Sequence, residues 1–329
     1  MKTKRPLIFC ALGALLIALG LLSMRYGSVF LDTKSFFSAL FRREGYATQS
    51  VIIYTLRLPR TLAGMLAGAG LGLSGVLLQS VTDNKMASPG LIGVNSGAGF
   101  AVILALSLPF FPIKLIPLAA FFGAFLATLA IIAIAGRMGM TKNTVVLSGI
   151  AFSAILSAGI SLLSLLDADV LVSYNAFSVG SLAGAESGEL LLPAILIIFA
   201  LTAALFAARK IDLLALGAPI ASSLGVRVKA LRVFCMLLAS ASAGAAVSVV
   251  GLLGFVGLMS PHIARALVGA EARRLIPATV LVGADLVLAA DLCGRVIFSP
   301  GEMPVGVLMA RLGAPFFLGI LLLGGQRDA

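Results

Sequence analysis

The chain has 329 residues, of which 60% are hydrophobic and only 11% are charged, and its mean hydropathy is +1.13. A soluble domain would carry about twice that charged fraction, so the composition excludes a soluble protein and predicts an all-α polytopic membrane protein. The formal net charge of +11, from 24 Lys and Arg against 13 Asp and Glu, indicates cytoplasmic loops in such a protein rather than a nucleic-acid partner.

The first apolar run, residues 6–24, follows Lys2, Lys4 and Arg5. It could be a signal peptide or a first membrane helix. We favour the helix because the run is long for a signal sequence and no small-x-small cleavage site follows, which places the N-terminus inside. Residues 27–56 carry several charges around an amphipathic SFFSALF and predict an outside loop with a short surface helix.

Residues 57–99 form the stretch around which we expect the chain to be organised. The positions from Thr61 to Ser80 hold no charged side chain, and at about 1.5 Å per residue they cover the roughly 30 Å of a hydrocarbon core. Gly64, Gly68 and Gly72 recur every four residues on one helix face, where glycine lets a neighbouring helix approach closely. We therefore predict a membrane helix with a glycine packing seam, then a turn and a glycine-rich re-entry to about residue 108.

The rest of the chain predicts further crossings and two distinctive connections. Membrane helices are expected at residues 115–136, 145–166, 190–208, 233–250, 254–268, 275–297 and 304–323, which brings the total to roughly ten. Residues 170–187 suit a short outer helix and turn, and residues 210–232 a polar, broken inside connection. Most Lys and Arg then fall at inside ends, which supports an N-terminus and a C-terminus inside.

Few residues of the kinds that bind metals or form disulfides are present. His262 is the only histidine, and Cys10, Cys235 and Cys293 lie far apart in apolar runs. A multi-histidine site or a disulfide framework needs clustered residues of these types. We therefore expect no metal site and no cofactor in this chain.

Several motifs stand out along the sequence. They are RLPRTLAG at 57–64, GAGLGLSGVLLQ at 68–79, NKMASPGLIGVNSGA at 84–98, GFVGLMSPHIAR at 254–265 and EMPVGVLMARLGAPFF at 302–317. Their residues and their order resemble the FecCD-type permeases of ABC importers, which include transporters for ferric siderophores, haem and cobalamin. The resemblance covers nearly the whole chain, which is similar to the cobalamin importer permease.

The resemblance implies one permease domain over residues 1–329, with ten helices in the type II ABC importer fold, in the bacterial cytoplasmic (inner) membrane. It implies as partners a second copy or a related permease, two cytoplasmic ATPase subunits, an external substrate-binding protein and the lipid bilayer. ATP and Mg would belong to the ATPase, since this chain has no G-x-x-x-x-G-K-[ST] motif to hold nucleotide phosphates.

Matching positions imply roles for particular residues at the two ends of the helices. Arg57, Arg60 and Arg295 match family arginines that meet acidic residues of the binding protein; the alternative is that they anchor helix ends at the headgroups. Asn84 matches a residue at the inner gate, and Thr141 and Thr144 lie near the second gate segment. The alternative for these three is helix capping.

The inside connection, residues 210–232, resembles the coupling helices that press into a groove on each ATPase; alternatively it is an interfacial helix that lies on lipid. The residues expected to make the coupling contact are Leu213, Leu214, Ala215, Leu216, Gly217, Ala221, Leu224 and Gly225. In the outer turn, Phe177, Gly180 and Ser181 are expected to line the pathway, and Phe177 stands where the family often has Trp. Lys85 and Met86 depart from the family's Pro and Leu.

Two charged residues are unusual inside apolar helices, Asp285 and Arg311. Because buried charges in lipid face a partner or a water-filled path, we predict an ion pair between Arg311 and Asp285 or Asp291. The leading function is ATP-driven import of an iron complex, with ferric siderophores first and haem and cobalamin next. An ion-coupled secondary transporter with Asp285, Asp291 and His262 as relays is the alternative. No cluster of nucleophile, base and orienter supports a membrane enzyme.

Overall fold

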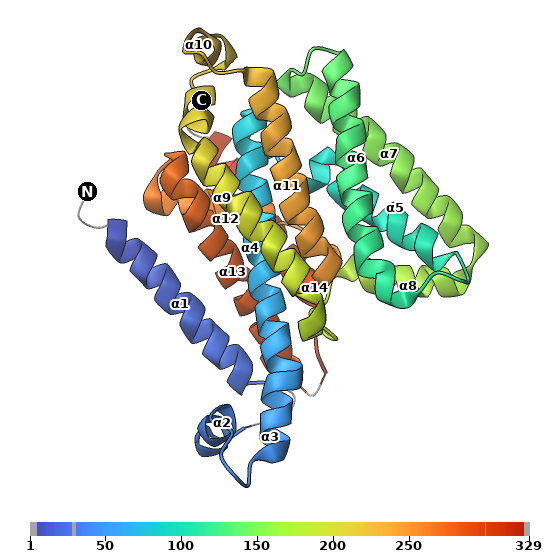
Figure 1. Cartoon of the computed structure of the whole chain (residues 1–329), viewed down its shortest axis with the longest axis vertical. Helices are drawn as coiled ribbons and strands as arrows, with labels where there is room; N and C mark the ends of the chain where they lie inside the picture. The colour runs from blue at the N-terminus through green and yellow to red at the C-terminus, as the bar shows by residue number, and fades with distance from the viewer. Residues whose placement is uncertain (1–4, 28–30, 300, 326–329) are drawn as a thin grey trace.

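The computed structural model describes residues 5–27, 31–299 and 301–325, and in that part of the chain every regular element is helical (Figure 1). The α-helices are α1 (Arg5–Arg25), α2 (Thr33–Leu40), α3 (Ala47–Val51), α4 (Leu58–Thr82), α5 (Val94–Leu106), α6 (Ile116–Arg137), α7 (Lys142–Leu166), α8 (Ala168–Val179), α9 (Leu191–Leu214), α10 (Ala218–Ser223), α11 (Val228–Val250), α12 (Val256–Val268), α13 (Ala272–Ile297) and α14 (Val305–Gly325). A π-helix (Ile52–Arg57) joins α3 to α4, and short 3₁₀ turns cover Pro89–Ile92, Ile113–Leu115 and Ser187–Glu189.

The predicted class, an all-α polytopic membrane protein, is confirmed. In the described residues seven helical stretches are long and apolar enough to cross a membrane: Pro6–Arg25, Ala47–Thr82, Ile113–Arg137, Lys142–Leu166, Ser187–Leu214, Val228–Val250 and Ala272–Ile297. Val94–Leu106 and Val305–Ile320 are apolar but shorter. The expected total of ten crossings therefore stays a prediction.

Helix α4 runs through the middle of the bundle and packs against α13, α11, α12 and α9 (Figure 1). Its glycines lie where backbones approach most closely. A Cβ atom at Gly68 would collide with the backbone of Gly283 in α13, and one at Gly72 would meet the carbonyl oxygen of Thr279. Gly64 lies against the side chain of Leu288, one turn further along α13. The sequence spacing thus coincides with the α4–α13 contact in the structure.

The bundle has two ends, named here by the short helices that mark them. The α10 end carries α10, the end of α4 and the beginnings of α7 and α13; the α2 end carries α2, α3, α8 and the hairpin between α13 and α14 (Figure 1). Helices α5, α6, α7 and α8 form one side of the molecule, and α5 packs against the other three.

Residues 27–56 were expected to form an outside loop with one surface helix, and their described part from residue 31 onward is more helical than the sequence indicated. The stretch Ala47–Thr82 is continuous over 36 residues, so the central helix begins before Arg57 rather than at it. The π-helix falls directly before Pro59, which has no N–H to donate, and this fits a local change of hydrogen-bond register. Ile53 of this extension is buried against Phe36 of α2, and Tyr54 Oη donates to the Leu40 carbonyl at 2.7 Å.

The membrane helix that was expected to end at residue 208 also ends later than expected. Helix α9 continues to Leu214, since Ile211 and Leu214 are buried in the main core and hold the last turns in place. The inside connection therefore shortens to α10 and its flanking turns, with positive φ at Gly217 and Gly225. The expected breaks at Gly217 and Gly225 are present, whereas Leu213 and Leu214 belong to α9.

Candidate functional site

At the α2 end, an acidic residue of α13 lies between two arginines from different helices. Asp291 Oδ1 accepts hydrogen bonds from Arg60 Nε (3.1 Å) and Nη2 (2.8 Å), and Asp291 Oδ2 lies 2.9 Å from Arg295 Nη2. The Asp291 side chain is 1% exposed and that of Arg295 is 3% exposed. Glu302, in the α13–α14 hairpin, completes the cluster by accepting from Arg60 Nη1 at 2.6 Å.

The other two predicted docking arginines are held by the end of α1. Arg295 Nη1 donates to the carbonyl oxygens of Ser23 (3.1 Å) and Tyr26 (3.0 Å), and its Nη2 donates to Ser23 Oγ at 2.7 Å. Arg57 Nη1 donates to the carbonyl oxygens of Met24 and Arg25. Both arginines are buried, so each joins α1 to the bundle in this structure.

These residues surround a small cavity of about 240 Å³ that opens between the outer turn and the central helix. Its lining includes Arg57, Arg60, Arg295 and Glu302 together with residues 182–185. The structure thus brings the three sequence-predicted arginines together. Of the three, Arg60 is the most accessible, with a side chain 14% exposed. Docking of a binding protein by these residues stays a prediction.

The expected ion pair of Arg311 is not formed, and this prediction is wrong for the described structure. Asp291 pairs with Arg60 and Arg295 instead, because α13 packs against α4 at this depth. The Arg311 side chain is exposed on α14. Asp285 is 5% exposed, and neither of its carboxylate oxygens has a hydrogen-bond partner among the described residues.

At the α10 end, the predicted inner-gate residues come from two neighbouring turns. Asn84 lines a cavity of about 490 Å³ together with Lys142 and Asn143, whereas Thr141 and Thr144 are not part of its lining. Asp83 ends α4 with φ 48°, and Asn84 Oδ1 accepts from the Met86 backbone at 2.9 Å, which shapes the turn. Thr141 caps α7, since its Oγ1 accepts from Thr144 N at 3.2 Å. Lys142 Nζ lies 3.3 Å from Asp83 Oδ2, so an exposed ion pair joins the two turns. Helix capping thus explains the position of Thr141, and the gate role of Asn84, Thr141 and Thr144 stays a prediction.

Beside this turn lies a polar group that sequence reasoning did not single out. Gln79 is 3% exposed, and its Oε1 accepts from Arg265 Nη2 at 3.3 Å, while Gln79 Nε2 and Arg265 Nη1 have no partner among the described residues. Both residues line a cavity of about 280 Å³ at the α10 end. The arginine that ends the mostly apolar motif at 254–265 was the only signal in the sequence.

The predicted coupling residues divide into buried and exposed groups. Ala221 is fully buried and Leu214 is 5% exposed, so these two hold α10 and the end of α9 against the bundle. Leu216, Ile220 and Leu224 are 56%, 51% and 57% exposed, which leaves an apolar surface around α10. Ala215 and Gly225 are also exposed, and Gly217 is half-buried. Ile220 was not among the residues expected to make this contact.

The outer turn is tied by backbone hydrogen bonds to α11, to the connection between α11 and α12, and to α14. The Phe177 carbonyl accepts from Leu252 N at 3.2 Å, Ser181 N donates to Val250 O at 2.9 Å, and Gly306 N donates to Gly180 O at 3.1 Å. Gly180 has φ 73°, and a Cβ there would collide with the Leu252 carbonyl. The Phe177 side chain is half-buried and packs against the main core. In the same helix, burial raises the pKa of the Tyr174 phenol.

No group of three His, Cys, Asp or Glu that could hold a metal ion occurs among residues 5–27, 31–299 and 301–325. The charged clusters are instead pairs and networks of arginine or lysine with acids. Such groups can fix helices to one another, attract a charged partner or stabilise a passing anion. None of the described arrangements places a nucleophile beside a base.

Comparison with known proteins gives a consistent result over almost the full length of the chain. The sequence model of the FecCD transport family matches residues 15–323. The Fe(3+)-citrate import system permease protein YfmE of Bacillus subtilis is 37% identical over 324 residues, covering 97% of this chain and 96% of that relative. The hemin transport system permease protein HmuU of Yersinia pestis is 37% identical over 321 residues, covering 94% and 95%. A solved inward-facing metal-chelate type ABC transporter superposes with a TM-score of 0.87 and 31% identity, covering 97% of this chain and 99% of that one.

Proposed function

Because the chain belongs to the FecCD transport family, we propose that it is the permease subunit of a binding-protein-dependent ABC importer that carries an iron chelate into the cell. The observation that carries this proposal is the near full-length similarity to permeases that are named for iron complexes or haem. A ferric siderophore or ferric citrate complex is the favoured substrate class, followed by haem and cobalamin. The substrate crosses without being chemically changed.

We place the chain in the bacterial cytoplasmic membrane as one permease domain, with the α10 end inside and the α2 end outside. The exposed cations at the α10 end, including Arg137, Lys210 and Arg273, support this orientation through the positive-inside rule. The chain pairs with a second copy or a related permease around a central pathway. Two ATPase subunits, which hold ATP and Mg, and an external binding protein complete the transporter.

The outer arginine cluster is the proposed docking place of the binding protein. Arg60 already holds Glu302, whose side chain is 33% exposed, so an acidic residue of the partner can approach the same guanidinium group. Arg57 and Arg295 add positive charge behind it from buried positions. The small cavity beside them offers space for one incoming side chain.

The α10 surface is the proposed contact with the ATPase. Its exposed apolar side chains, Leu216, Ile220 and Leu224, have no cover within the described chain, and the buried Ala221 fastens the helix to the bundle. A helix held in this way transmits movement of a partner to α9 and α11, which it connects. The turn at Asn84 and the beginning of α7, capped by Thr141, are the proposed inner gate, since Asn84 and Lys142 line one cavity.

One observation favours the alternative of an ion-coupled secondary transporter. Asp285 is a buried acid within a candidate membrane span and has no arginine or lysine partner among the described residues, and intramembrane acids of this kind mark proton pathways. Asp291 is occupied by two arginines, and His262 is half-buried against Phe316, with ring centroids 6.0 Å apart. Only Asp285 therefore suits a relay role.

Uptake into liposomes decides between these two functions. Vesicles containing this chain, with or without the ATPase and binding protein, are offered ferric citrate, a ferric siderophore, haem and cobalamin, with and without ATP inside. Uptake of one ligand that needs ATP and both partners is the expected result and names the substrate. Uptake by this chain alone under an ion gradient would overturn the importer proposal.

A further inference from the structure

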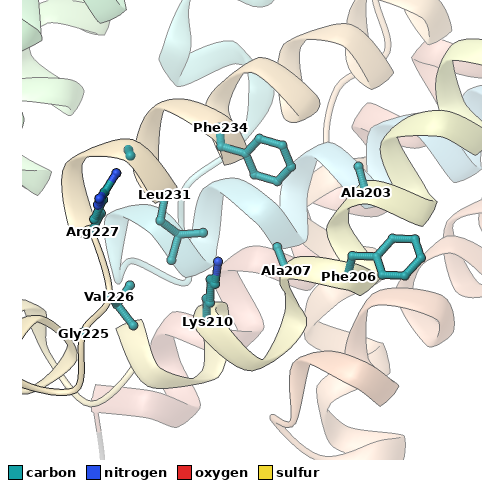
Figure 2. A pocket seen from close by; sticks show the side chains of 10 residues that line it. Ala203, Phe206, Ala207, Lys210, Gly225, Val226, Arg227, Leu231 and Phe234 are labelled. Carbon is teal, nitrogen blue, oxygen red and sulfur yellow. The ribbon is translucent and has the colours of Figure 1, made fainter.

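A pocket of about 540 Å³ opens between α9 and α11 at the α10 end, and of its lining residues only Gly225 belongs to a contact predicted above. Its walls come from Ala203, Phe206 and Ala207 of α9 and from Ala230, Leu231 and Phe234 of α11, with Lys210, Gly225, Val226 and Arg227 at the remaining side. Figure 2 shows the Lys210 and Arg227 side chains toward one end of this pocket and the rings of Phe206 and Phe234 toward the other. The pocket is therefore amphipathic along its length.

The charged end carries two cations that the described chain leaves without a counter-ion. Lys210 and Arg227 are both exposed, and no ion pair or hydrogen bond joins either side chain to another described residue. Lys210 lines the pocket from the last turns of α9, and Arg227 lines it from the position directly before α11. An anionic group at this end of the pocket would be attracted by both charges.

The apolar end points into the membrane-spanning part of the bundle. Ala203 lies seven residues before Lys210 on α9, so the wall extends about 10 Å along the helix from the charged end. Phe206 is 92% exposed within the candidate membrane span Ser187–Leu214, and Phe234 is 39% exposed within Val228–Val250. These aromatic surfaces can only be covered by something apolar.

A second apolar groove continues from the first around α11. It has a volume of about 670 Å³ and shares Arg227, Ala230 and Phe234 with the first pocket. Its other lining residues are Val228, Lys229, Val233 and Leu237, so a further cation lies beside Arg227. Two apolar channels thus meet at one cationic position. This shape matches a molecule with one anionic head and two hydrocarbon chains.

We propose that this surface is a binding site for an anionic phospholipid, with the phosphate between Lys210 and Arg227 and the acyl chains along Phe206 and Phe234. Basic pockets between membrane helices are known to bind anionic headgroups, and each Lys or Arg near the membrane surface strengthens that binding by a similar amount. This inference goes beyond the proposed function, because it requires only that the α10 end lie at a membrane surface. Since Gly225 and Val226 follow α10 directly, the bound lipid contacts the segment that joins α10 to α11.

Native mass spectrometry of the full chain, titrated with phosphatidylglycerol or with phosphatidylcholine of the same acyl chains, tests the site. The chain is expected to bind phosphatidylglycerol more tightly. Lys210→Gln with Arg227→Gln should lower that affinity about thirty-fold, or about 2 kcal/mol at 1.4 kcal/mol per tenfold, while Lys210→Arg with Arg227→Lys keeps it. Neither pair should affect folding, because both side chains are exposed and make no described polar contact.

Two further arms separate lipid from other occupants. Arg137→Gln with Arg273→Gln removes the same charge from exposed positions at the same end, outside the pocket, and should change nothing. Phe206→Ala should weaken both lipids about tenfold, since it removes apolar contact area. Equal binding by the Lys210/Arg227 variant and the unaltered chain, or displacement of the lipid by inorganic phosphate at equal concentration, would overturn the proposal and leave the surface to a small anion or a protein partner.

Discussion

Removing the charge of Asp291 should destabilise the bundle more than any other single change to an acidic residue. Asp291→Asn keeps the shape of the side chain but leaves Arg295, 3% exposed, with only the neutral acceptors of Ser23 and Tyr26. Breaking a buried ion pair from one side costs about 3–5 kcal/mol. Because Arg60 keeps its contact with Glu302, we expect the lower part of that range, about 3 kcal/mol of unfolding free energy.

The measurement is equilibrium unfolding by SDS in mixed micelles, followed by circular dichroism. Asp83→Asn is the matched control, since Asp83 and Lys142 form a pair whose side chains are 68% and 53% exposed. An exposed pair contributes less than about 1 kcal/mol, so this variant should unfold almost as the unaltered chain does. Equal losses of unfolding free energy in the two variants would refute the argument that burial determines how much the Asp291 network contributes to stability.

Three other substitutions test separate parts of the proposal. Arg60→Gln should weaken the binding protein about tenfold in a titration, whereas Arg43→Gln, an exposed cation at the same end, should not. Ile220→Asp should abolish co-purification of the ATPase without changing stability, because that side chain is 51% exposed. Asp285→Asn should raise the unfolding free energy by removing a buried unpaired charge and leave ATP-driven uptake intact; loss of an ion-driven uptake instead would support secondary transport.

Hydropathy and glycine spacing were sufficient to predict the class of fold and the identity of the central helix. Period and length are local properties, and in a bilayer every backbone polar group must be satisfied within its own helix. Because the four-residue spacing is also a local property, the seam at Gly68 and Gly72 could be predicted without knowing which helix packs against it. The partner itself, Gly283 of α13, lies too far along the chain for any local pattern to reveal.

The ion pair of Asp291 shows where local reasoning ends. The sequence suggested Arg311, because a hairpin brings α13 and α14 together, whereas the structure pairs Asp291 with Arg60, 231 residues away. That choice depends on how α4 crosses α13, which is decided by packing of the glycine seam. The long helix from Ala47 was missed for a related reason, since its first turns are stabilised by contacts with α2 rather than by their own composition.

The charges at the two ends of the bundle impose different conditions on partners. At the α2 end Arg60 and Arg295 are already compensated by Asp291 and Glu302, so an incoming acid exchanges one ion pair for another and gains less electrostatic energy than it would from an unpaired arginine. At the α10 end Lys210 and Arg227 are exposed and have no described counter-ion, so an anion can pair with them without breaking an existing ion pair. If the outer partner docks by exchange, its affinity should depend weakly on salt, while anionic lipid at the α10 end should be lost steeply as salt screens the two cations. The reverse pattern, with a steep salt dependence at the α2 end and a weak one at the α10 end, would contradict this distribution of compensated and uncompensated charge.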